Sequence, residues 1–187
     1  EFIRKADFLV LTFGTSFVYR LKSSGEVVAN CHKIEANKFV REQCSVEGIV
    51  STYNRLITGL KTINPDLTIV FTVSPIRHWK DGAHQNQISK SILLLAIDEL
   101  VRLNNCALYF PAYELMLDDL RDYRFYKEDM LHPNDVAIEY IWEAFGNCFF
   151  AKETKQINKE VAVLVKNENH RPFNPNSENY AVFLSEN

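Results

Sequence analysis

The sequence lacks the features that mark several specialised classes of protein. No apolar run reaches the roughly 18 to 20 residues that a membrane-spanning helix needs. The four cysteines lie far apart without a Cys-x-x-Cys pair, which argues against a disulfide framework and favours a reducing compartment such as the cytoplasm. The net charge is only -3 and lysine and arginine are scattered, so neither nucleic acid nor an anionic membrane surface is an expected partner.

Apolar residues, by contrast, are abundant enough to form a packed core. They make up 47% of the 187 residues, and 12% of the chain is aromatic, as in a globular domain. After residue 151 the composition shifts towards lysine, glutamate and asparagine. We therefore predict one domain over residues 1–151, followed over residues 152–187 by a helical extension and a polar arm.

Three short apolar runs alternate along the chain with three helical patterns. The runs are nearly continuous, which is typical of strands covered on both faces, and they span residues 7–13, 67–73 and 106–110. Apolar residues with a 3.6-residue period predict helices over residues 46–63 and 89–103, and a third from a cap at Asn134 or Asp135 to about Phe145. Strands that alternate with helices in this order are joined by right-handed crossovers into a parallel sheet. The pattern therefore predicts an α/β fold.

The remaining segments predict a hairpin, a loop and an incomplete sheet. Residues 17–29 contain a Ser23-Ser24-Gly25 turn between two short apolar pairs, as in a hairpin. Residues 112–131 are polar, aromatic and poorly periodic, which is typical of a long functional loop, and we predict a helical turn near residues 114–120 within it. Three strands are fewer than the about five or six of a typical sheet, and the chain begins at Glu1 rather than at methionine. We therefore expect a longer polypeptide with one or two further strands before Glu1.

The most informative motif is Asp129-Met130-Leu131-His132-Pro133, which precedes the third helical pattern. On a loop, an aspartate three residues before a histidine orients the imidazole from one side, while the other ring nitrogen faces a reacting hydroxyl. His132 is therefore the candidate general base and Asp129 the candidate orienting residue. The alternative roles are structural, with His132 capping the next helix and Asp129 bonded to its own backbone in a turn.

Other polar residues follow the predicted strands, where ligands of parallel sheets bind. The carboxyl ends of such strands form one rim, and ligands lie outside it. Here the rim carries the segments Gly14-Thr15-Ser16, Ser74-Pro75-Ile76-Arg77-His78 and Pro111-Ala112-Tyr113-Glu114. Arg77 and His78 are candidates for binding an anionic group or developing charge, and a surface salt bridge is the alternative for Arg77.

Three further groups of residues are weaker candidates. Ser74 is a candidate nucleophile at a strand end, but Ser-Pro after a strand is common turn chemistry. Cys31 and His32 are adjacent, so their side chains usually point apart, and no third partner is evident. His32, His78 and His84 lack the spacing of metal ligands, so we predict no metal and no other cofactor.

Several segments, taken together, are far more specific than any one of them. They are Leu11-Thr12-Phe13-Gly14-Thr15, Asn30-Cys31-His32-Lys33, Thr72-Val73-Ser74-Pro75-Ile76-Arg77-His78, Tyr109-Phe110-Pro111-Ala112-Tyr113-Glu114, and Leu120-Arg121-Asp122-Tyr123-Arg124 before the Asp129 motif. Over nearly the whole chain they resemble the GSCFA-domain proteins, which are related to the SGNH hydrolases. The resemblance implies a flavodoxin-like three-layer α/β/α fold, with Asp129 and His132 in the Asp-x-x-His positions of the hydrolase triad.

The chain departs from this family at two places. The family is named for an N-terminal Gly-Ser-Cys-Phe-Ala motif whose serine resembles the SGNH nucleophile, and this sequence has no such motif. Gly14-Thr15-Ser16 resembles the Gly-x-Asn block that supplies oxyanion donors, with Ser16 where the asparagine would stand and Asn30 as a candidate substitute.

The resemblance implies an ester hydrolase that removes an O-acyl group from a carbohydrate or a small metabolite. Its serine is expected in an N-terminal segment that is missing from this chain. The rival hypothesis is a non-catalytic module that binds a glycan or a nucleotide-like ligand on the same scaffold, because a fold does not by itself determine a function.

Overall fold

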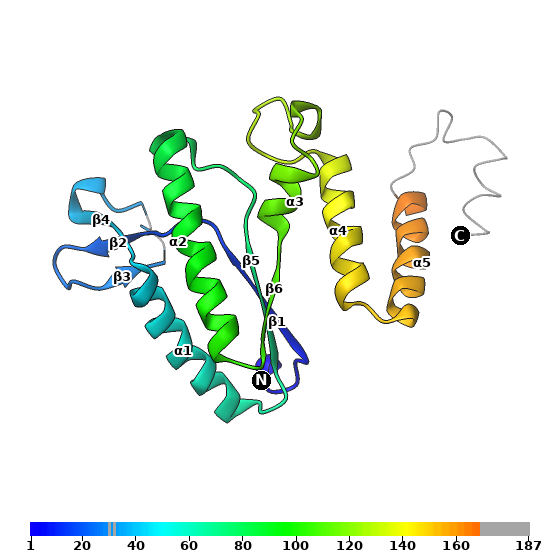
Figure 1. Cartoon of the computed structure of the whole chain (residues 1–187), viewed down its shortest axis with the longest axis horizontal. Helices are drawn as coiled ribbons and strands as arrows, with labels where there is room; N and C mark the ends of the chain where they lie inside the picture. Colours follow the sequence, from blue (N-terminus) through cyan, green and yellow to red (C-terminus); the bar gives the residue numbers. More distant parts are fainter. Residues whose placement is uncertain (30, 32, 169–187) are drawn as a thin grey trace. The chain divides into compact units, whose positions relative to one another are not determined.

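A three-stranded parallel sheet organises the N-terminal part of the chain (Figure 1). The computed structural model describes residues 1–29, 31 and 33–168. The strands lie in the order β1-β5-β6 and comprise β1 (Phe8–Phe13), β5 (Thr68–Val73) and β6 (Ala107–Phe110). Pairing is parallel along all three strands, so their carboxyl ends meet at one rim. These strands confirm the three predicted apolar runs to within one residue at their starts.

Two helices cover one face of this sheet. α1 (Val46–Ile63) begins after Ser45, whose hydroxyl accepts a hydrogen bond from the Gly48 amide at 3.1 Å, and it ends at the residue predicted. α2 (Gly82–Leu103) begins before the predicted residue 89, because its first two turns are polar and carry no apolar period. The buried core between helices and sheet includes Ile49, Ile57, Leu93, Ala96, Ile97 and Leu100 from the helices and Phe13, Ile69, Phe71, Val73 and Ala107 from the strands. Burying each large side chain contributes about 1.5 to 3 kcal/mol.

The opposite face of the sheet is only partly covered by the described residues. Thr72 on the central strand is buried, whereas Phe8, Val10 and Leu108 on the flanking strands are 52%, 46% and 40% exposed. α3 (Ala112–Asp118) follows β6 and packs against β5. The predicted α/β class is confirmed, and the parallel sheet with the five described α-helices is consistent with a three-layer α/β/α fold.

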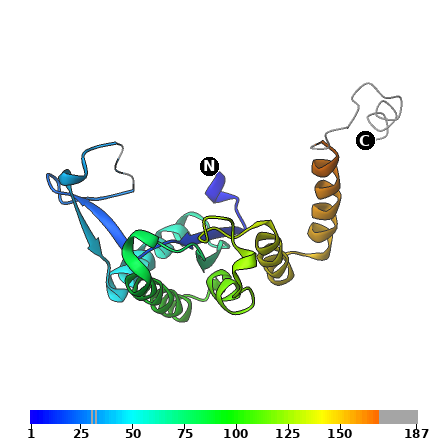
Figure 2. The same ribbon diagram turned by 90° about the horizontal axis from the view of Figure 1, so that it is seen from above.

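A second, antiparallel sheet lies beyond the carboxyl end of β1 (Figure 2). Its strands, in the order β3-β2-β4, are β2 (Phe17–Leu21), β3 (Val27–Val28) and β4 (Phe39–Gln43). β2 and β3 confirm the predicted hairpin, whereas β4 is not predicted by the sequence pattern. Arg41 of β4 ties this sheet to the segment before α2, because its Nη2 donates to both carboxylate oxygens of Asp81 at 2.7 Å.

α4 (Asp135–Phe149) begins directly after the loop that carries the Asp129 motif. The side chain of Asn134 accepts a hydrogen bond from the Ala137 amide at 3.1 Å, as expected for a helix cap. The chain divides within α4, after Ile141, into two compact units. The first unit, Glu1–Ile141, contains both sheets and α1 to α3.

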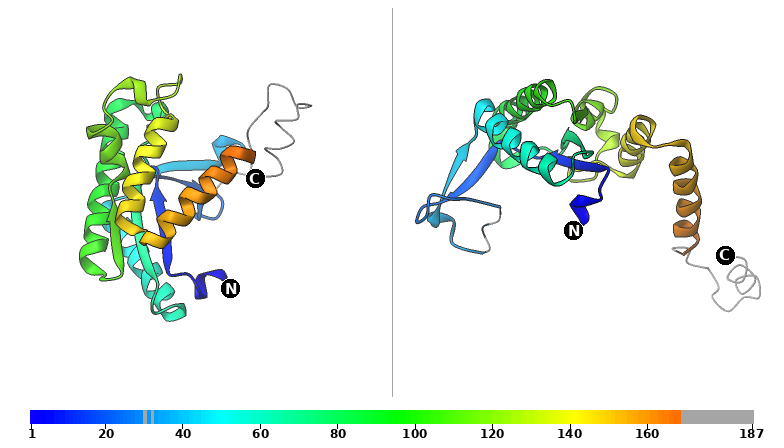
Figure 3. Two further views of the ribbon diagram at one scale, coloured as in Figure 1. Left: turned by 90° about the vertical axis from the view of Figure 1, so that its right-hand side faces the viewer. Right: turned by 90° about the horizontal axis from the view of Figure 1, so that it is seen from below.

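The described residues of the second unit comprise the end of α4 and α5 (Lys152–Glu168), which follow one another after a short link (Figure 3). Trp142 stacks on Phe145 with 5.8 Å between ring centroids. α5 occupies the segment for which a helical extension is predicted, while the predicted polar arm lies outside the described residues. None of the helices that the structure describes has the length and apolar character needed to span a membrane.

Candidate active site

The loop at residues 126–133 is closed by its own backbone. Tyr126 and Pro133 form an isolated antiparallel bridge at its base. Inside this bridge the Lys127 amide donates to the His132 carbonyl at 2.8 Å. The loop is therefore a defined turn that holds its side chains in fixed relation, although it lies at the protein surface.

Asp129 and His132 are in direct contact within this turn. Asp129 Oδ2 lies 2.6 Å from His132 Nδ1, and Asp129 Oδ1 accepts from the backbone amides of Leu131 at 2.8 Å and His132 at 2.9 Å. These bonds, first from the His132 amide, then from the Leu131 amide and the His132 ring, lower the pKa of Asp129 from 3.8 to about 2. Asp129 is therefore ionised at neutral pH and only accepts, which places a proton on the Nδ1 of His132.

In a neutral ring of this tautomer, His132 Nε2 is the accepting nitrogen. Nε2 has no hydrogen-bond partner within the described part of the chain, and the His132 side chain is 51% exposed. The helix that follows is capped by Asn134 rather than by His132. One carboxylate oxygen of Asp129 accepts the backbone hydrogen bonds of the turn, as expected for a structural role, and the other contacts the His132 ring. The pair is thus accessible for proton transfer to a bound molecule.

Arg77 connects the segment after β5 to this loop. Its Nη2 donates to the Met130 carbonyl, and its guanidinium carbon lies 5.5, 5.8 and 5.1 Å from the ring centroids of Trp79, Tyr123 and Tyr126. Such contacts between a guanidinium and aromatic faces are attractive. Arg77 forms no salt bridge with any residue that the structure describes, and its Nε is buried there without a hydrogen-bond partner. The charge of Arg77 is therefore not neutralised by a neighbouring carboxylate.

His78 lies against the end of β1 rather than against the Asp129 loop. Its Nε2 is 3.4 Å from the position that a Cβ on Gly14 would occupy, which is the distance of an ordinary van der Waals contact. The backbone amide of His78 donates to the buried Asn86 Oδ1 at 2.9 Å. Burial, followed by the charge of Lys90, lowers the pKa of His78 below its usual 6.5. His78 is therefore a neutral packing partner of the rim near pH 7.

Lys90 of α2 belongs to the same rim and is not identified by the sequence analysis. Its side chain is fully buried, and its Nζ donates to the carbonyls of Gly14 at 2.7 Å and Ser74 at 2.6 Å. Burial lowers the pKa of Lys90 from 10.5 to about 8. Its burial could have been predicted from its position, because Lys90 lies three residues before Leu93 on the apolar face of the helix. Lys90 thus joins the ends of β1 and β5.

Ser89 of α2 fixes the segment that follows β1. Its hydroxyl accepts from the Ser16 amide at 2.8 Å and lies 3.0 Å from both Ser16 Oγ and Thr15 Oγ1. The Ser16 hydroxyl also accepts from Gln43 Nε2 at 3.1 Å, and Ser16 is only 2% exposed. The structure therefore places Ser16 in a buried network, whereas His132 is exposed. Asn30, the other candidate oxyanion donor, lies outside the described residues.

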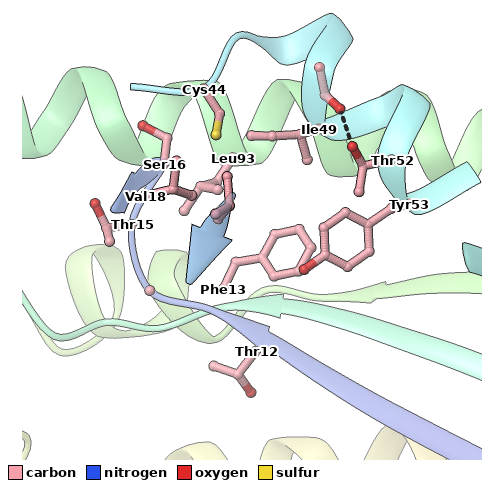
Figure 4. Close-up of a pocket in the computed structure, with 13 residues that line it drawn as sticks. Thr12, Phe13, Thr15, Ser16, Val18, Cys44, Ile49, Thr52, Tyr53 and Leu93 are labelled. Atoms are coloured by element: carbon pink, nitrogen blue, oxygen red, sulfur yellow. Dashed lines mark hydrogen bonds between the residues drawn. The ribbon is translucent and has the colours of Figure 1, made fainter. Parts of the chain in front are cut away.

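A cavity of about 470 Å³ adjoins the rim at Gly14 and Thr15 (Figure 4). Its walls come from the end of β1, the β2–β3 hairpin, the start of α1 and one residue of α2. Most of the lining is apolar, and it includes Phe13, Val18, Val27, Cys44, Ile49, Tyr53 and Leu93. The sequence gives no direct signal for this cavity, because its walls are far apart along the chain.

The histidines and cysteines are otherwise dispersed. No group of three or more His, Cys, Asp or Glu side chains is arranged to hold a metal ion within residues 1–29, 31 and 33–168. His84 is exposed on α2, and His32 lies outside the described residues. Cys31, Cys44, Cys106 and Cys148 are free thiols.

Comparison with known proteins relates the chain to one described family. The model of the GSCFA family matches residues 1–145. This range contains both sheets, Lys90, Arg77 and the loop with Asp129 and His132. No curated protein matches the chain.

Proposed function

Because the chain belongs to the GSCFA family, we propose that it forms part of an ester hydrolase of the SGNH type. The proposed reaction removes an O-acyl group from a carbohydrate or a small metabolite. The observation that carries the proposal is the 2.6 Å contact between Asp129 Oδ2 and His132 Nδ1 on an exposed loop, with His132 Nε2 free of partners among the described residues. An acid that orients a histidine in this way is two thirds of a hydrolytic triad.

In the proposed reaction, a serine hydroxyl attacks the ester carbonyl carbon while His132 Nε2 takes its proton. The carboxylate of Asp129 stabilises the imidazolium that forms. Collapse of the tetrahedral intermediate breaks the ester C–O bond, and His132 returns the proton to the leaving alkoxide. Water then attacks the acyl-serine in the same way and releases the carboxylic acid. General base catalysis of this kind contributes about a hundred- to ten-thousandfold in rate.

We assign the serine to the Gly-Ser-Cys-Phe-Ala segment for which the family is named, outside residues 1–187. Support comes from His132, whose Nε2 meets no hydroxyl or thiol of the described residues within hydrogen-bond distance. In the proposed enzyme, a nucleophile supplied from elsewhere in the polypeptide would lie against this nitrogen.

The backbone at the end of β1 is the proposed oxyanion site, with Asn30 as a further donor. The amides of Gly14 and Thr15 have no acceptor among the residues that the structure describes, whereas the Ser16 amide already donates to Ser89. Lys90 bonds the Gly14 carbonyl, and this polarises the peptide group whose N–H belongs to Thr15. Loss of one oxyanion donor typically lowers kcat by about a hundred- to a thousandfold.

Exposed aromatic rings beside the loop favour a carbohydrate as the alcohol part of the ester. Trp79 and Tyr123 are 67% and 62% exposed, although both contact the same Arg77 guanidinium. Flat aromatic faces next to a cationic donor suit a sugar ring, which has apolar C–H faces and hydroxyls at its edge. A fully apolar alcohol would leave the Arg77 donors unused.

The experiment that tests the proposal measures hydrolysis of p-nitrophenyl acetate by the full-length polypeptide. We expect His132→Ala to lower kcat/KM by at least about a hundredfold. His84→Ala is the matched control, because His84 is exposed on α2 and makes no contact with the loop residues described above. Equal rates for wild type and His132→Ala would refute the assignment.

The second candidate function is a non-catalytic module that binds a glycan on this scaffold. The specific observation in its favour is that the described residues place no nucleophile against His132. In that case the full-length polypeptide would bind acetylated oligosaccharides without hydrolysing them. Retained binding with no ester hydrolysis, in wild type and His132→Ala alike, is the result that would favour it.

A further inference from the structure

The cavity beside β1 is lined by neutral groups only. None of the described residues that form its wall is Asp, Glu, Lys, Arg or His. At about 470 Å³ it lies within the range of cavities that hold small ligands, which is roughly 300 to 1,000 Å³. A cavity with walls of this kind favours an apolar ligand over water or an ion.

Three hydroxyl groups in the wall are already bonded within the protein. Thr15 Oγ1 and Ser16 Oγ bond to Ser89, and Thr52 Oγ1 donates to the Gly48 carbonyl at 2.8 Å (Figure 4). Forming hydrogen bonds to a ligand would require these contacts to be given up. These three hydroxyl groups therefore offer little to a polar ligand.

Three polar side chains in the wall have no such bond to any described residue. They are Thr12, Tyr53, whose ring lies 4.7 Å from that of Phe13, and the half-buried thiol of Cys44. Burial raises the pKa of both the Tyr53 hydroxyl and the Cys44 thiol, so both are uncharged near neutral pH. Neither group provides a binding partner for a charged ligand.

The cavity adjoins the proposed oxyanion site. Gly14 and Thr15 are among the residues that line it, and their amides are the donors proposed for the ester carbonyl oxygen. An acyl group has its carbonyl at one end and its hydrocarbon chain at the other. A carbonyl placed at Gly14 and Thr15 therefore directs the chain towards Phe13, Ile49 and Leu93.

We infer that this cavity binds the aliphatic chain of the acyl group, with a medium-length chain such as octanoyl or decanoyl as its ligand. The identity of the ester rests on the proposed function, whereas binding of the chain itself does not require hydrolysis. Each methylene that enters the cavity is expected to tighten binding about fourfold. Acetate, which has no chain to bury, is expected to bind weakly.

The cysteines provide a direct readout of occupancy. The purified protein is labelled with N-ethylmaleimide at about pH 8, where thiolate begins to form, and the extent of labelling is read for each cysteine by peptide mass spectrometry. We expect decanoate, below its micelle-forming concentration, to slow the labelling of Cys44 at least tenfold, and acetate to leave it unchanged. Cys106 and Cys148 lie outside the cavity and are internal controls whose labelling should stay constant.

A pair of matched variants tests whether protection arises inside the cavity. Val27 and Val40 are 50% and 46% exposed on the same small sheet, but only Val27 lines the cavity. We expect Val27→Trp to fill the cavity and remove the protection by decanoate, and Val40→Trp to keep it. Far-ultraviolet circular dichroism verifies that both variants are folded.

Two results would overturn the inference: Cys44 labelling that decanoate does not slow in the wild type, or protection that persists in folded Val27→Trp. Protection of Cys44 in a protein without esterase activity would uphold the chain-binding cavity and refute the proposed reaction. Ester hydrolysis without protection of Cys44 would support the proposed reaction and refute the chain-binding cavity. The two failures are therefore distinguishable.

Discussion

The rim of the parallel sheet holds two kinds of titratable group in opposite environments. Lys90 is fully buried and its ammonium bonds two backbone carbonyls, whereas His132 is half exposed and bonds the carboxylate of Asp129. Burial shifts the pKa of Lys90 towards the neutral form, while hydrogen bonds shift the pKa of Asp129 towards the charged form. The comparison separates a buried residue that bonds the ends of two strands from an exposed pair that is accessible to a ligand.

The largest expected effect is on the exposed pair. We predict that Asp129→Asn lowers kcat/KM for ester hydrolysis by the full-length polypeptide by about a thousandfold or more, because an amide neither stabilises an imidazolium nor fixes the Nδ1–H tautomer. Asp98→Asn, at an exposed position on α2, is the matched control. A loss of less than tenfold in Asp129→Asn would contradict this role.

Replacement of the buried lysine is expected to act on stability. In Lys90→Met the Gly14 and Ser74 carbonyls lose their donor, and we predict a loss of about 2 to 4 kcal/mol in the free energy of unfolding. Lys80→Met is the control, since Lys80 is exposed and contacts Tyr19, whose hydroxyl lies 2.9 Å and whose ring centroid lies 5.5 Å from the Lys80 Nζ. Urea unfolding followed by circular dichroism measures both variants. Similar losses in the two would show that the rim does not depend on Lys90.

The pH dependence of stability sharpens the same comparison. In the folded protein the pKa of Lys90 is lowered from 10.5 to about 8, so between these values the unfolded chain binds more protons. The free energy of unfolding should therefore rise with pH in this window. We expect a gain of about 1 to 3 kcal/mol for wild type relative to Lys90→Met over this range. Urea unfolding at about pH 7.5 and 10.5 measures the gain, and identical pH profiles would be incompatible with a buried, titrating Lys90.

The smallest expected effect concerns Gly14, whose carbonyl bonds the buried Lys90. A Cβ on Gly14 would lie 3.4 Å from His78 Nε2, which is an ordinary van der Waals contact, so Gly14→Ala is predicted to change the free energy of unfolding by less than about 0.5 kcal/mol. Gly59→Ala is the counterpart, because its Cβ meets open space in the interior of α1, and a gain of about 0.5 to 1 kcal/mol is expected. Thermal unfolding measures both variants. A loss of more than about 1 kcal/mol in Gly14→Ala would show that His78 is packed more tightly against the end of β1 than this contact implies.

Local sequence patterns predict the parallel sheet and its helices because burial leaves a periodic trace. The continuous apolar runs become β1, β5 and β6, and the 3.6-residue period of residues 46–63 becomes α1. β4 is not predicted by such a pattern. Only its first residue, Phe39, is buried, whereas Arg41 and Glu42 are charged, so the strand shows neither a continuous nor an alternating apolar pattern, and its partner β2 is distant in sequence.

The candidate site is predictable where it is local and unpredictable where it is not. Asp129 and His132 are three residues apart, and their spacing alone indicates the contact that the structure contains. The contact of Arg77 with Met130 joins residues 53 positions apart, and no local pattern indicates it. Lys90 is not predicted for a different reason. A charged residue at an apolar position of a helical pattern is normally expected to reach solvent, and the two carbonyl acceptors that allow its burial are known only from the structure.

The most direct test of the central claim is the reaction of the full-length polypeptide with a fluorophosphonate, which modifies only activated serines. The account predicts one adduct, on the serine of the Gly-Ser-Cys-Phe-Ala segment, formed at least about a hundredfold more slowly in His132→Ala than in His84→Ala. Absence of an adduct in the wild type, or equal rates in the two variants, would contradict the claim that Asp129 and His132 activate a serine.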